Sequence, residues 1–183
     1  MSRKDMSDFL VHWTKEVDGS NAFDNLFNIY ENMELLGGSG FIKGDYRCVC
    51  FTEAPEGTFH DVWSRYSGFG VKVRKDWLFA KGGRPVIYQS DDEYDLLHED
   101  QKWRHVRYEP CSDFRVDFTW EREWRYHGDI LSLEEECVSL IVPDEESADR
   151  FLHWHNTLEA HALGEYYIFP SPLRVNLEVL DRA

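Results

Sequence analysis

The sequence contains no long apolar run and comparatively little positive charge. No stretch approaches the roughly 18 consecutive apolar residues that a membrane-spanning helix needs. The N-terminus carries no apolar signal core, so we expect a cytoplasmic protein without a membrane partner. Lysine and arginine total 20 against 35 aspartate and glutamate residues, which gives a net charge of −15. This charge repels a phosphate backbone, so it favours small-molecule or protein partners, and a nucleic-acid acceptor would need a local basic groove.

Signatures of metal sites and of phosphate-binding loops are also missing. The four cysteines form no CxxC pair, so we expect reduced thiols. HExxH is absent, and on a helix His153 and His155 would point about 200° apart, too far to chelate one ion. We therefore expect no metal. The run Gly37–Gly40 lacks the spacing of the phosphate-binding loops and is interpreted as a helix stop.

Apolar and aromatic residues are abundant, and their spacing switches between helix and strand patterns. Aromatic residues make up 15% of the chain, enough for a full core and for a pocket that stacks a planar ligand. The apolar residues of 23–33 repeat at helical intervals, which predicts a helix that ends before Gly37, and a second helix is expected after Pro143. Short helices are predicted within 60–66, 75–79 and 96–106. Strands are predicted at 9–14, 47–52, 68–73, 86–88, 114–118, 137–142, 166–169 and 173–180.

The segment Phe118–Arg125 combines two glutamates, two arginines and two tryptophans in eight residues. If the segment is extended, Glu121, Glu123 and Arg125 share one face, and the tryptophans pack on the other. The two carboxylates would then lie about 7 Å apart, where they could hold a ribose hydroxyl or stabilise a cationic transition state. The alternative, which spacing alone favours, is a solvated strand face neutralised by the arginines.

Five other side chains combine hydrogen-bonding or stacking capacity with apolar surroundings. His12 and Thr14 share one face of the first strand and could bond a sugar or a carboxamide. The alternative is a histidine satisfied by backbone groups. Tyr66, Phe69 and Tyr88 suit either core packing or stacking on a planar ligand.

The order of these motifs resembles a known family. A strand with His12-x-Thr is followed by Asn25-Leu-Phe-Asn-Ile-Tyr-Glu-Asn-Met-Glu-Leu, Arg47-Cys-Val-Cys-Phe-Thr-Glu-Ala-Pro, Trp63-Ser-Arg-Tyr-Ser-Gly-Phe-Gly, Arg84-Pro-Val-Ile-Tyr and Glu121-Arg-Glu-Trp-Arg. Over residues 9–142 this order resembles the bacterial AbiGi-type phage-resistance proteins. More distantly, it is similar to the DarT toxins and to the ADP-ribosyltransferase fold with its His-Tyr-Glu signature.

Short strands interspersed with three or four helices, without regular βαβ repetition, predict an α+β fold, and the length favours a single domain over residues 1–183. The resemblance implies a split, mixed β-sheet of the ADP-ribosyltransferase type. The core would cover about residues 9–142, and a C-terminal helix and strands would cover 143–183. NAD, as a substrate, would lie in the cleft between the two halves of the sheet.

The resemblance also implies roles for individual residues. His12 would hold the nicotinamide ribose, with Thr14 beside it, and Tyr66 or Phe69 would stack on nicotinamide. Arg47 resembles the arginine that precedes the second strand of DarT-like proteins, and Tyr88 completes the expected NAD-binding set. Glu123 would be the catalytic carboxylate, and Glu121 would help to choose the acceptor.

The implied activity is cleavage of the nicotinamide–ribose bond of NAD and transfer of ADP-ribose to a macromolecular acceptor, in phage defence or toxin–antitoxin conflict. AbiGi-type proteins are commonly regarded as antitoxin components, so the first alternative is a catalytically inactive protein that binds a partner toxin. The second alternative is an RNA-processing toxin that uses His12, Glu121 and Arg125 as acid, base and phosphate clamp.

Overall fold

The largest sheet has the strand order β1-β4-β10-β11 in the computed structural model, which describes residues 6–17, 19–53, 66–164 and 170–180. Its strands are β1 (Phe9–Trp13), β4 (Gly70–Arg74), β10 (Val138–Val142) and β11 (Asn176–Val179). β4 is antiparallel to both β1 and β10, whereas β11 runs parallel to β10. The sheet is therefore mixed, as the sequence predicted.

A second, three-stranded sheet has the order β3-β8-β5 and is antiparallel. It consists of β3 (Cys48–Phe51), β8 (Trp124–His127) and β5 (Arg84–Pro85). β1 and β3 meet at a single residue pair, where Val11 and Thr52 exchange two backbone hydrogen bonds of 2.9 and 2.8 Å. This pair joins the two sheets at one point.

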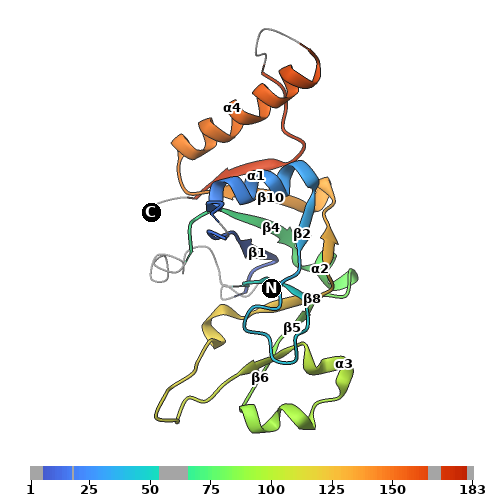
Figure 1. Ribbon diagram of the computed structural model, residues 1–183, viewed down its shortest axis with the longest axis vertical. Coiled ribbons are helices and arrows are strands. Elements are labelled where there is room, and N and C mark those ends of the chain that lie inside the picture. The colour runs from blue at the N-terminus through green and yellow to red at the C-terminus, as the bar shows by residue number, and fades with distance from the viewer. Residues whose placement is uncertain (1–5, 18, 54–65, 165–169, 181–183) are drawn as a thin grey trace.

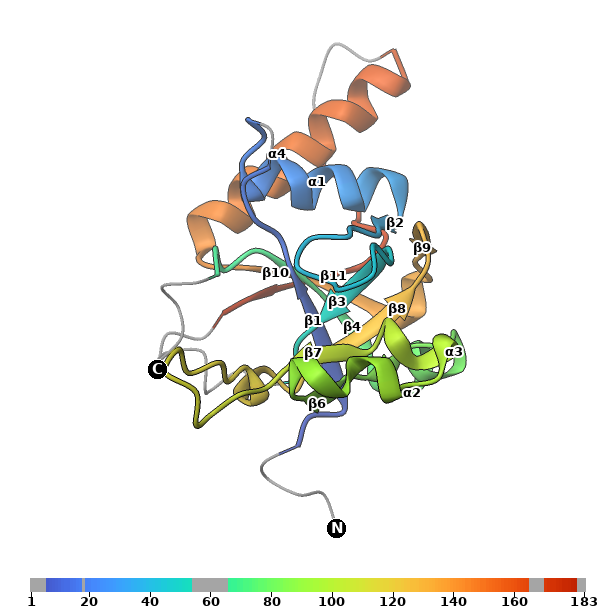
Figure 2. The ribbon, with the colours of Figure 1, turned by 60° about the horizontal axis from the view of Figure 1, so that its bottom comes forward.

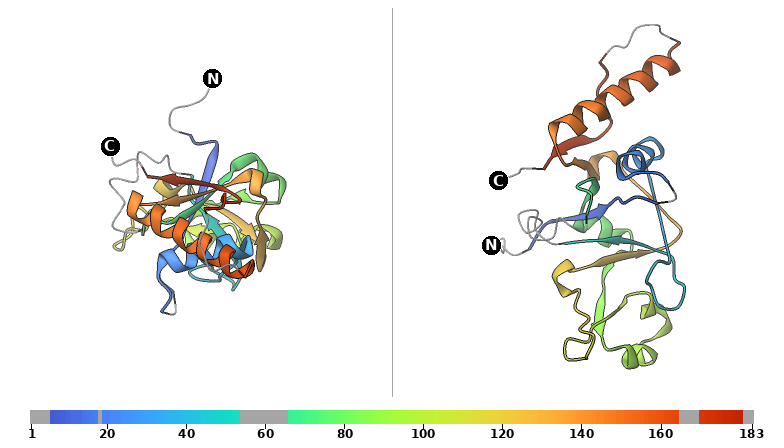
Figure 3. Two further views of the ribbon diagram at one scale, coloured as in Figure 1. Left: turned by 90° about the horizontal axis from the view of Figure 1, so that it is seen from above. Right: turned by 60° about the vertical axis from the view of Figure 1, so that its left-hand side comes forward.

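Two helices cover one side of the four-stranded sheet, and the smaller elements lie on the other side. Figures 1 and 2 show α4 (Glu145–Ala162) and α1 (Ala22–Asn32) stacked beyond β10, with β5, β6 and α3 at the opposite end. The same order is visible from the side in the right-hand view of Figure 3. The remaining elements are β2 (Glu34–Leu36), α2 (Lys75–Ala80), β6 (Ile87–Gln89), α3 (Glu99–Lys102), β7 (His105–Arg107), β9 (Ile130–Ser132) and 3₁₀ helices at Asp91–Leu96, Thr119–Glu121 and Glu135–Cys137.

The core forms where α1 and α4 pack against the large sheet. Phe23, Leu26, Phe27 and Tyr30 recur at i, i+3, i+4 and i+7 and are buried, which places one apolar stripe of α1 in the core. Phe151 of α4 belongs to the same cluster. Each fully buried side chain of this size contributes roughly 1.5–3 kcal/mol. The core therefore extends beyond residue 142, the boundary that the resemblance implied.

Several predicted elements differ from the observed ones for local reasons. The helix predicted over residues 23–33 ends at Asn32, where Met33 adopts a left-handed conformation (φ 51°), and β2 follows at once in place of the expected glycine stop. The helix predicted within 96–106 is replaced by a 3₁₀ helix, α3 and β7, because Ser90 and His98 each cap a separate short turn. Residues 114–118 form only one β-bridge, between Glu109 and Val116. The predictions for 60–65 and 166–169 lie outside the described residues.

No helix in the described ranges is long and apolar enough to cross a membrane.

Candidate functional site

The segment Phe118–Arg125 is not one strand, so the expected face with two adjacent carboxylates is wrong. Thr119–Glu121 forms a 3₁₀ turn, Arg122 adopts a left-handed conformation with φ 46°, and β8 begins only at Trp124. The cause is Asp117, whose Oδ1 accepts hydrogen bonds from the Thr119 N–H (3.1 Å) and hydroxyl (2.7 Å) and thereby starts the turn. Glu121 and Glu123 consequently project from different elements.

Glu123 is held by a buried arginine. Arg125 Nε lies 2.7 Å from Glu123 Oε1, and the two side chains are only 6% and 13% exposed. Arg125 Nη1 also donates to the carbonyls of Trp103 (2.8 Å) and His105 (3.0 Å). Burial alone would lower the pKa of Arg125, but the Glu123 carboxylate outweighs it and the pKa is raised. The guanidinium is therefore a fixed cation that orients Glu123.

Cys50 approaches Glu123 from the neighbouring strand. Cys50 is the cross-strand partner of Arg125 in the β3–β8 pair, which places it near Glu123. Burial, followed by the negative charge of Glu123, raises the pKa of the thiol far above its usual range. The thiol is therefore protonated at neutral pH.

His12 lies on the other side of Cys50. Its Nδ1 is 2.9 Å from the Cys50 carbonyl, and because a carbonyl only accepts, Nδ1 carries the hydrogen. Burial lowers the pKa of His12, so the ring is neutral at pH 7 and Nε2 presents a lone pair. Within the described part of the chain Nε2 makes no hydrogen bond. The Nε2 lone pair of His12 is thus available as a hydrogen-bond acceptor.

The neutral state of His12 predicts a pH-dependent stability. Its pKa in the folded protein lies below the unfolded value of 6.5, so the unfolded chain takes up a proton first as the pH falls. The free energy of unfolding should therefore fall more for the wild type than for His12→Gln between about pH 7.5 and about pH 5.5. Urea unfolding at both pH values measures this difference. His98→Gln, at a side chain that is 75% exposed, is the control and should follow the wild type; parallel losses in all three proteins would contradict the prediction.

Tyr66 brings Glu121 into the same region. Its ring stacks on Trp13 with centroids 5.6 Å apart and planes 30° apart. Burial raises the pKa of the Tyr66 hydroxyl, and the charge of Glu121 adds to the shift. Thr52 and Glu121 both lie close enough to this hydroxyl to affect its pKa. Tyr66 therefore connects the β1 side of the site with the turn that carries Glu121.

Tyr88 fastens the turn from its other side. Its hydroxyl accepts the N–H of Glu123 at 3.0 Å and donates to the carbonyl of Phe118 at 3.2 Å. Burial raises the pKa of Tyr88 to about 12. The hydroxyl thus bridges the two ends of the turn and fixes the backbone at Glu123.

An open cleft of about 320 Å³ lies beside Glu123. It is lined by Met6, Glu53, Pro85, Val86, Tyr88, Arg122, Glu123 and Trp124. Glu53, which the sequence reasoning did not select, is buried and accepts from Lys75 Nζ at 2.7 Å and from Trp124 Nε1 at 2.8 Å. Its position directly after an apolar strand was the signal that could have identified it.

Three of the expected ligand-binding residues have structural roles instead. Thr14 is buried and its hydroxyl lies 2.8 and 3.1 Å from the carbonyls of Ala22 and Phe69. Phe69 packs edge-on against Phe23 of the core, with ring centroids 5.8 Å apart. Arg47 precedes β3 and pairs with Asp129 at 2.7 Å, and it lies three residues, roughly 10 Å of extended chain, from Cys50. The structure therefore brings together His12, Tyr66, Tyr88, Glu121 and Glu123 but not these three.

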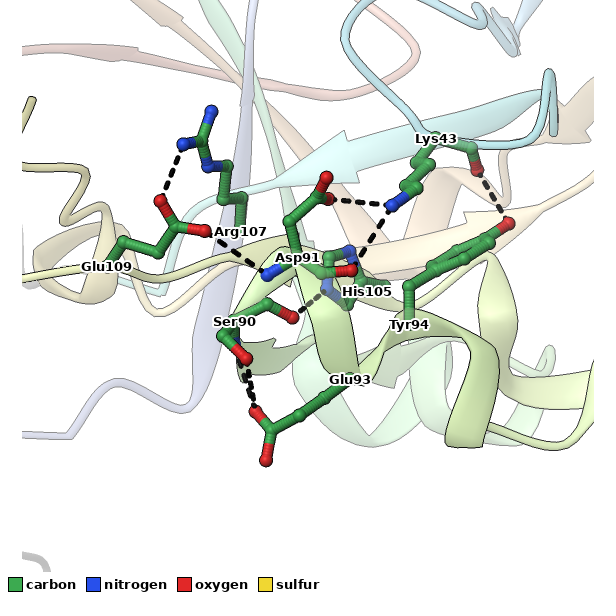
Figure 4. A network of polar contacts seen from close by, with 8 residues as sticks. All are labelled: Lys43, Ser90, Asp91, Glu93, Tyr94, His105, Arg107 and Glu109. Atoms are coloured by element: carbon green, nitrogen blue, oxygen red, sulfur yellow. Dashed lines mark hydrogen bonds and ion pairs between the residues drawn. The ribbon is translucent and has the colours of Figure 1, made fainter. Parts of the chain in front are cut away.

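A network of polar side chains around His105 lies next to the Glu123–Arg125 pair and has a structural role. Figure 4 shows Lys43 turned toward Asp91, at 2.9 Å, and Arg107 toward Glu109, at 2.5 Å. The His105 ring lies 3.3 Å from the Ser90 carbonyl, while the His105 backbone carbonyl accepts from Arg125. The network thus anchors the strand that holds the Glu123–Arg125 pair.

A hydrogen-bonded cluster around His155 connects Ser171 and Arg174 to α4 and α1. His155 lies with Nδ1 3.2 Å from the Tyr30 hydroxyl and Nε2 3.0 Å from Ser171 Oγ. Tyr30 also accepts from the Arg174 N–H, and Ser171 Oγ donates to Asn156 Oδ1 at 3.2 Å. Because Ser171 has an acceptor other than the histidine, it is held as a structural group and is not set up as a nucleophile.

No group of three or more His, Cys, Asp or Glu residues within the described ranges is arranged to hold a metal ion. The fold class that these features define is α+β with mixed sheets. Comparison with protein-family models, with curated proteins and with solved structures finds no match to this chain.

Proposed function

We propose that the chain is an ADP-ribosyltransferase-like enzyme that cleaves the nicotinamide–ribose bond of NAD. The supporting observation is the convergence of His12, Tyr66 and Glu123, which are far apart in the sequence, around Cys50 and the junction of the two sheets. These are the residues that the His-Tyr-Glu resemblance selected. A sheet split at one residue pair is also the arrangement that the resemblance implies for an NAD cleft.

The proposed chemistry uses each group according to its protonation state. His12 accepts a hydrogen bond from a ribose hydroxyl through Nε2. The Glu123 carboxylate stabilises the positive charge that develops on the ribose as the C1′–N bond breaks and its electron pair leaves with nicotinamide. A nucleophile of the acceptor, or water, then attacks C1′ and loses a proton. Tyr66, held by Trp13, offers a ring of the kind that stacks on nicotinamide.

The test measures NAD binding and NAD cleavage separately. NAD should raise the melting temperature in proportion to occupancy, and incubation with labelled NAD and cell lysate should release nicotinamide and label a macromolecule. The nature of the labelled product identifies the acceptor class. Absence of both stabilisation and nicotinamide release would overturn the proposal.

A second candidate is a catalytically inactive protein with the same fold that binds a partner toxin in phage defence or toxin–antitoxin conflict. The observation that favours it is the ion pair of Glu123 with Arg125, which already neutralises the carboxylate. The net charge of −15 suits a basic partner protein. NAD binding without nicotinamide release, together with tight binding to a toxin encoded beside this chain, is the result that distinguishes it.

The RNA-processing alternative has less support. It requires Arg125 to clamp a phosphate, but the Arg125 side chain is buried and its Nε and Nη1 already donate to Glu123 and to two carbonyls. Turning this guanidinium toward a ligand would leave those acceptors unpaired.

A further inference from the structure

We propose that Glu53 is a positioning residue that fixes the turn carrying Glu123, an inference that rests on the proposed function. The Glu53 N–H donates to the Glu121 carbonyl at 3.1 Å, and the Glu53 carboxylate accepts the indole N–H of Trp124 at 2.8 Å. Glu121 lies two residues before Glu123, and Trp124 directly follows it. One residue just after β3 therefore holds the chain on both sides of the carboxylate that the proposed reaction requires.

The turn needs this support because its backbone is strained at Arg122. This residue has φ 46° and ψ 51°, the left-handed region that glycine adopts readily and other residues disfavour. Such a conformation persists only where the surrounding structure holds it. The Glu123 N–H donates to the Tyr88 hydroxyl, and the Glu123 carbonyl accepts the Val86 N–H, each at 3.0 Å. These two bonds hold Glu123 itself, whereas Glu53 holds the residues on either side.

The Glu53 carboxylate is itself held in one orientation. Lys75 Nζ donates to Oε1 at 2.7 Å, which directs Oε2 to Trp124 Nε1. The Glu53 and Lys75 side chains are only 7% and 19% exposed, so water and salt screen this ion pair little. Lys75 Nζ also lies 6.0 Å from the centre of the Trp124 ring. Because Lys75 begins α2 directly after β4, and Trp124 begins β8, the three side chains connect the Glu123 segment to the large sheet.

The position of Glu123 matters most in the transition state of the proposed reaction. Its carboxylate acts on charge that develops only as the C1′–N bond breaks, and a displacement of about 1 Å at such a group can cost about 100-fold in rate. Glu53 and Trp124 line the cleft beside Glu123. Since the Glu53 oxygens accept from Lys75 and Trp124, Glu53 acts through these neighbours and is not a catalytic residue.

The first experiment measures nicotinamide release from NAD by Glu53→Ala, Trp124→Phe and the double variant Lys75→Met/Glu53→Gln. Glu53→Ala and Trp124→Phe each remove one partner of the carboxylate–indole bond, so kcat should fall about 10-fold with KM changed less than about twofold. The double variant lacks the ion pair, but its amide oxygen still accepts the Trp124 N–H. Its kcat should therefore recover to within about threefold of the wild type.

Glu178→Ala is the matched control for loss of a lysine–glutamate pair. Glu178 belongs to β11 of the large sheet and lies 2.7 Å from Lys72 Nζ, the same separation as in the Glu53–Lys75 pair. This variant should keep kcat within about threefold of the wild type. Equal losses in Glu178→Ala and Glu53→Ala, full activity of Trp124→Phe, or no recovery in Lys75→Met/Glu53→Gln would each overturn the inference.

A second measurement requires no activity. Hydrogen exchange followed by NMR compares the Trp124 indole N–H and the Glu123 backbone N–H in the wild type and in Glu53→Ala. The Trp77 indole, which donates to Glu134 at 3.0 Å, is the internal reference. Both N–H groups should exchange at least about 10-fold faster in the variant while Trp77 is unchanged, because exchange follows local opening of the structure. An unchanged exchange rate at Glu123 would overturn the positioning role.

The two measurements separate failure of this inference from failure of the proposed function. If the wild type releases no nicotinamide, the proposed function fails, and with it the effect of Glu53 on catalysis. The exchange rates still decide whether Glu53 fixes the position of Glu123.

Discussion

Glu123→Gln should reduce nicotinamide release from NAD by about 10²–10³-fold, the typical loss when one preorganised electrostatic group is removed from an active site. The amide keeps the shape of the side chain but lacks the charge that stabilises the ribose as the C1′–N bond breaks. NAD binding, followed by the thermal shift, should remain close to that of the wild type. The loss should therefore appear in kcat and not in affinity.

Glu121→Gln is the matched control for this prediction, because Glu121 lies two residues away and near Tyr66, whereas Glu123 is the carboxylate paired with Arg125. This variant should release nicotinamide at a rate within about 10-fold of the wild type and lose more of the transfer to the acceptor. Full activity of Glu123→Gln, or a larger loss of nicotinamide release in Glu121→Gln, would move the catalytic assignment away from Glu123.

Arg125→Met should lower the free energy of unfolding by about 3–5 kcal/mol, because it leaves the buried Glu123 charge without its partner. Two backbone carbonyls, those of Trp103 and His105, also lose their donor. Urea unfolding at neutral pH measures the change. The double variant Glu123→Gln/Arg125→Met should recover part of the loss, since no uncompensated carboxylate remains.

The pair Lys72–Glu178 is the control for the effect of burial. Lys72 Nζ lies 2.7 Å from Glu178 Oε2, the same distance as in the Arg125–Glu123 pair, but the Lys72 and Glu178 side chains are 13% and 31% exposed. Lys72→Met should therefore cost clearly less, about 1 kcal/mol. Similar losses of unfolding free energy in Lys72→Met and Arg125→Met would show that the buried pair contributes no more to stability than the more exposed one.

The elements set by local patterns were predictable, whereas the contacts that build the site were not. The apolar residues of α1 recur at helical intervals, so this helix follows from the sequence alone. The position of Cys50 opposite Arg125, beside Glu123, depends on the register of β3 with β8, which joins segments more than 70 residues apart. No local pattern encodes that register.

Before the turn at Arg122, the sequence carries a turn signal and a strand signal that compete. Asp117 followed by Thr119 is a turn-forming pair, but the alternation of residues 114–118 favoured an extended reading. That reading put Glu121 beside Glu123 on one strand. The observed turn instead places Glu121 near Tyr66 and leaves Glu123 paired with Arg125.

The pair Val11–Thr52 determines how the two sheets meet. Within the described residues it supplies the only backbone hydrogen bonds between the four-stranded and the three-stranded sheet. Leu10 and Val71 of one sheet pack in the same core as Val49 and Phe51 of the other, and His12 is bonded to the Cys50 carbonyl across the junction. His12 belongs to one sheet and Glu123 adjoins the other, so their separation is set by this shared core and not by either strand ladder alone.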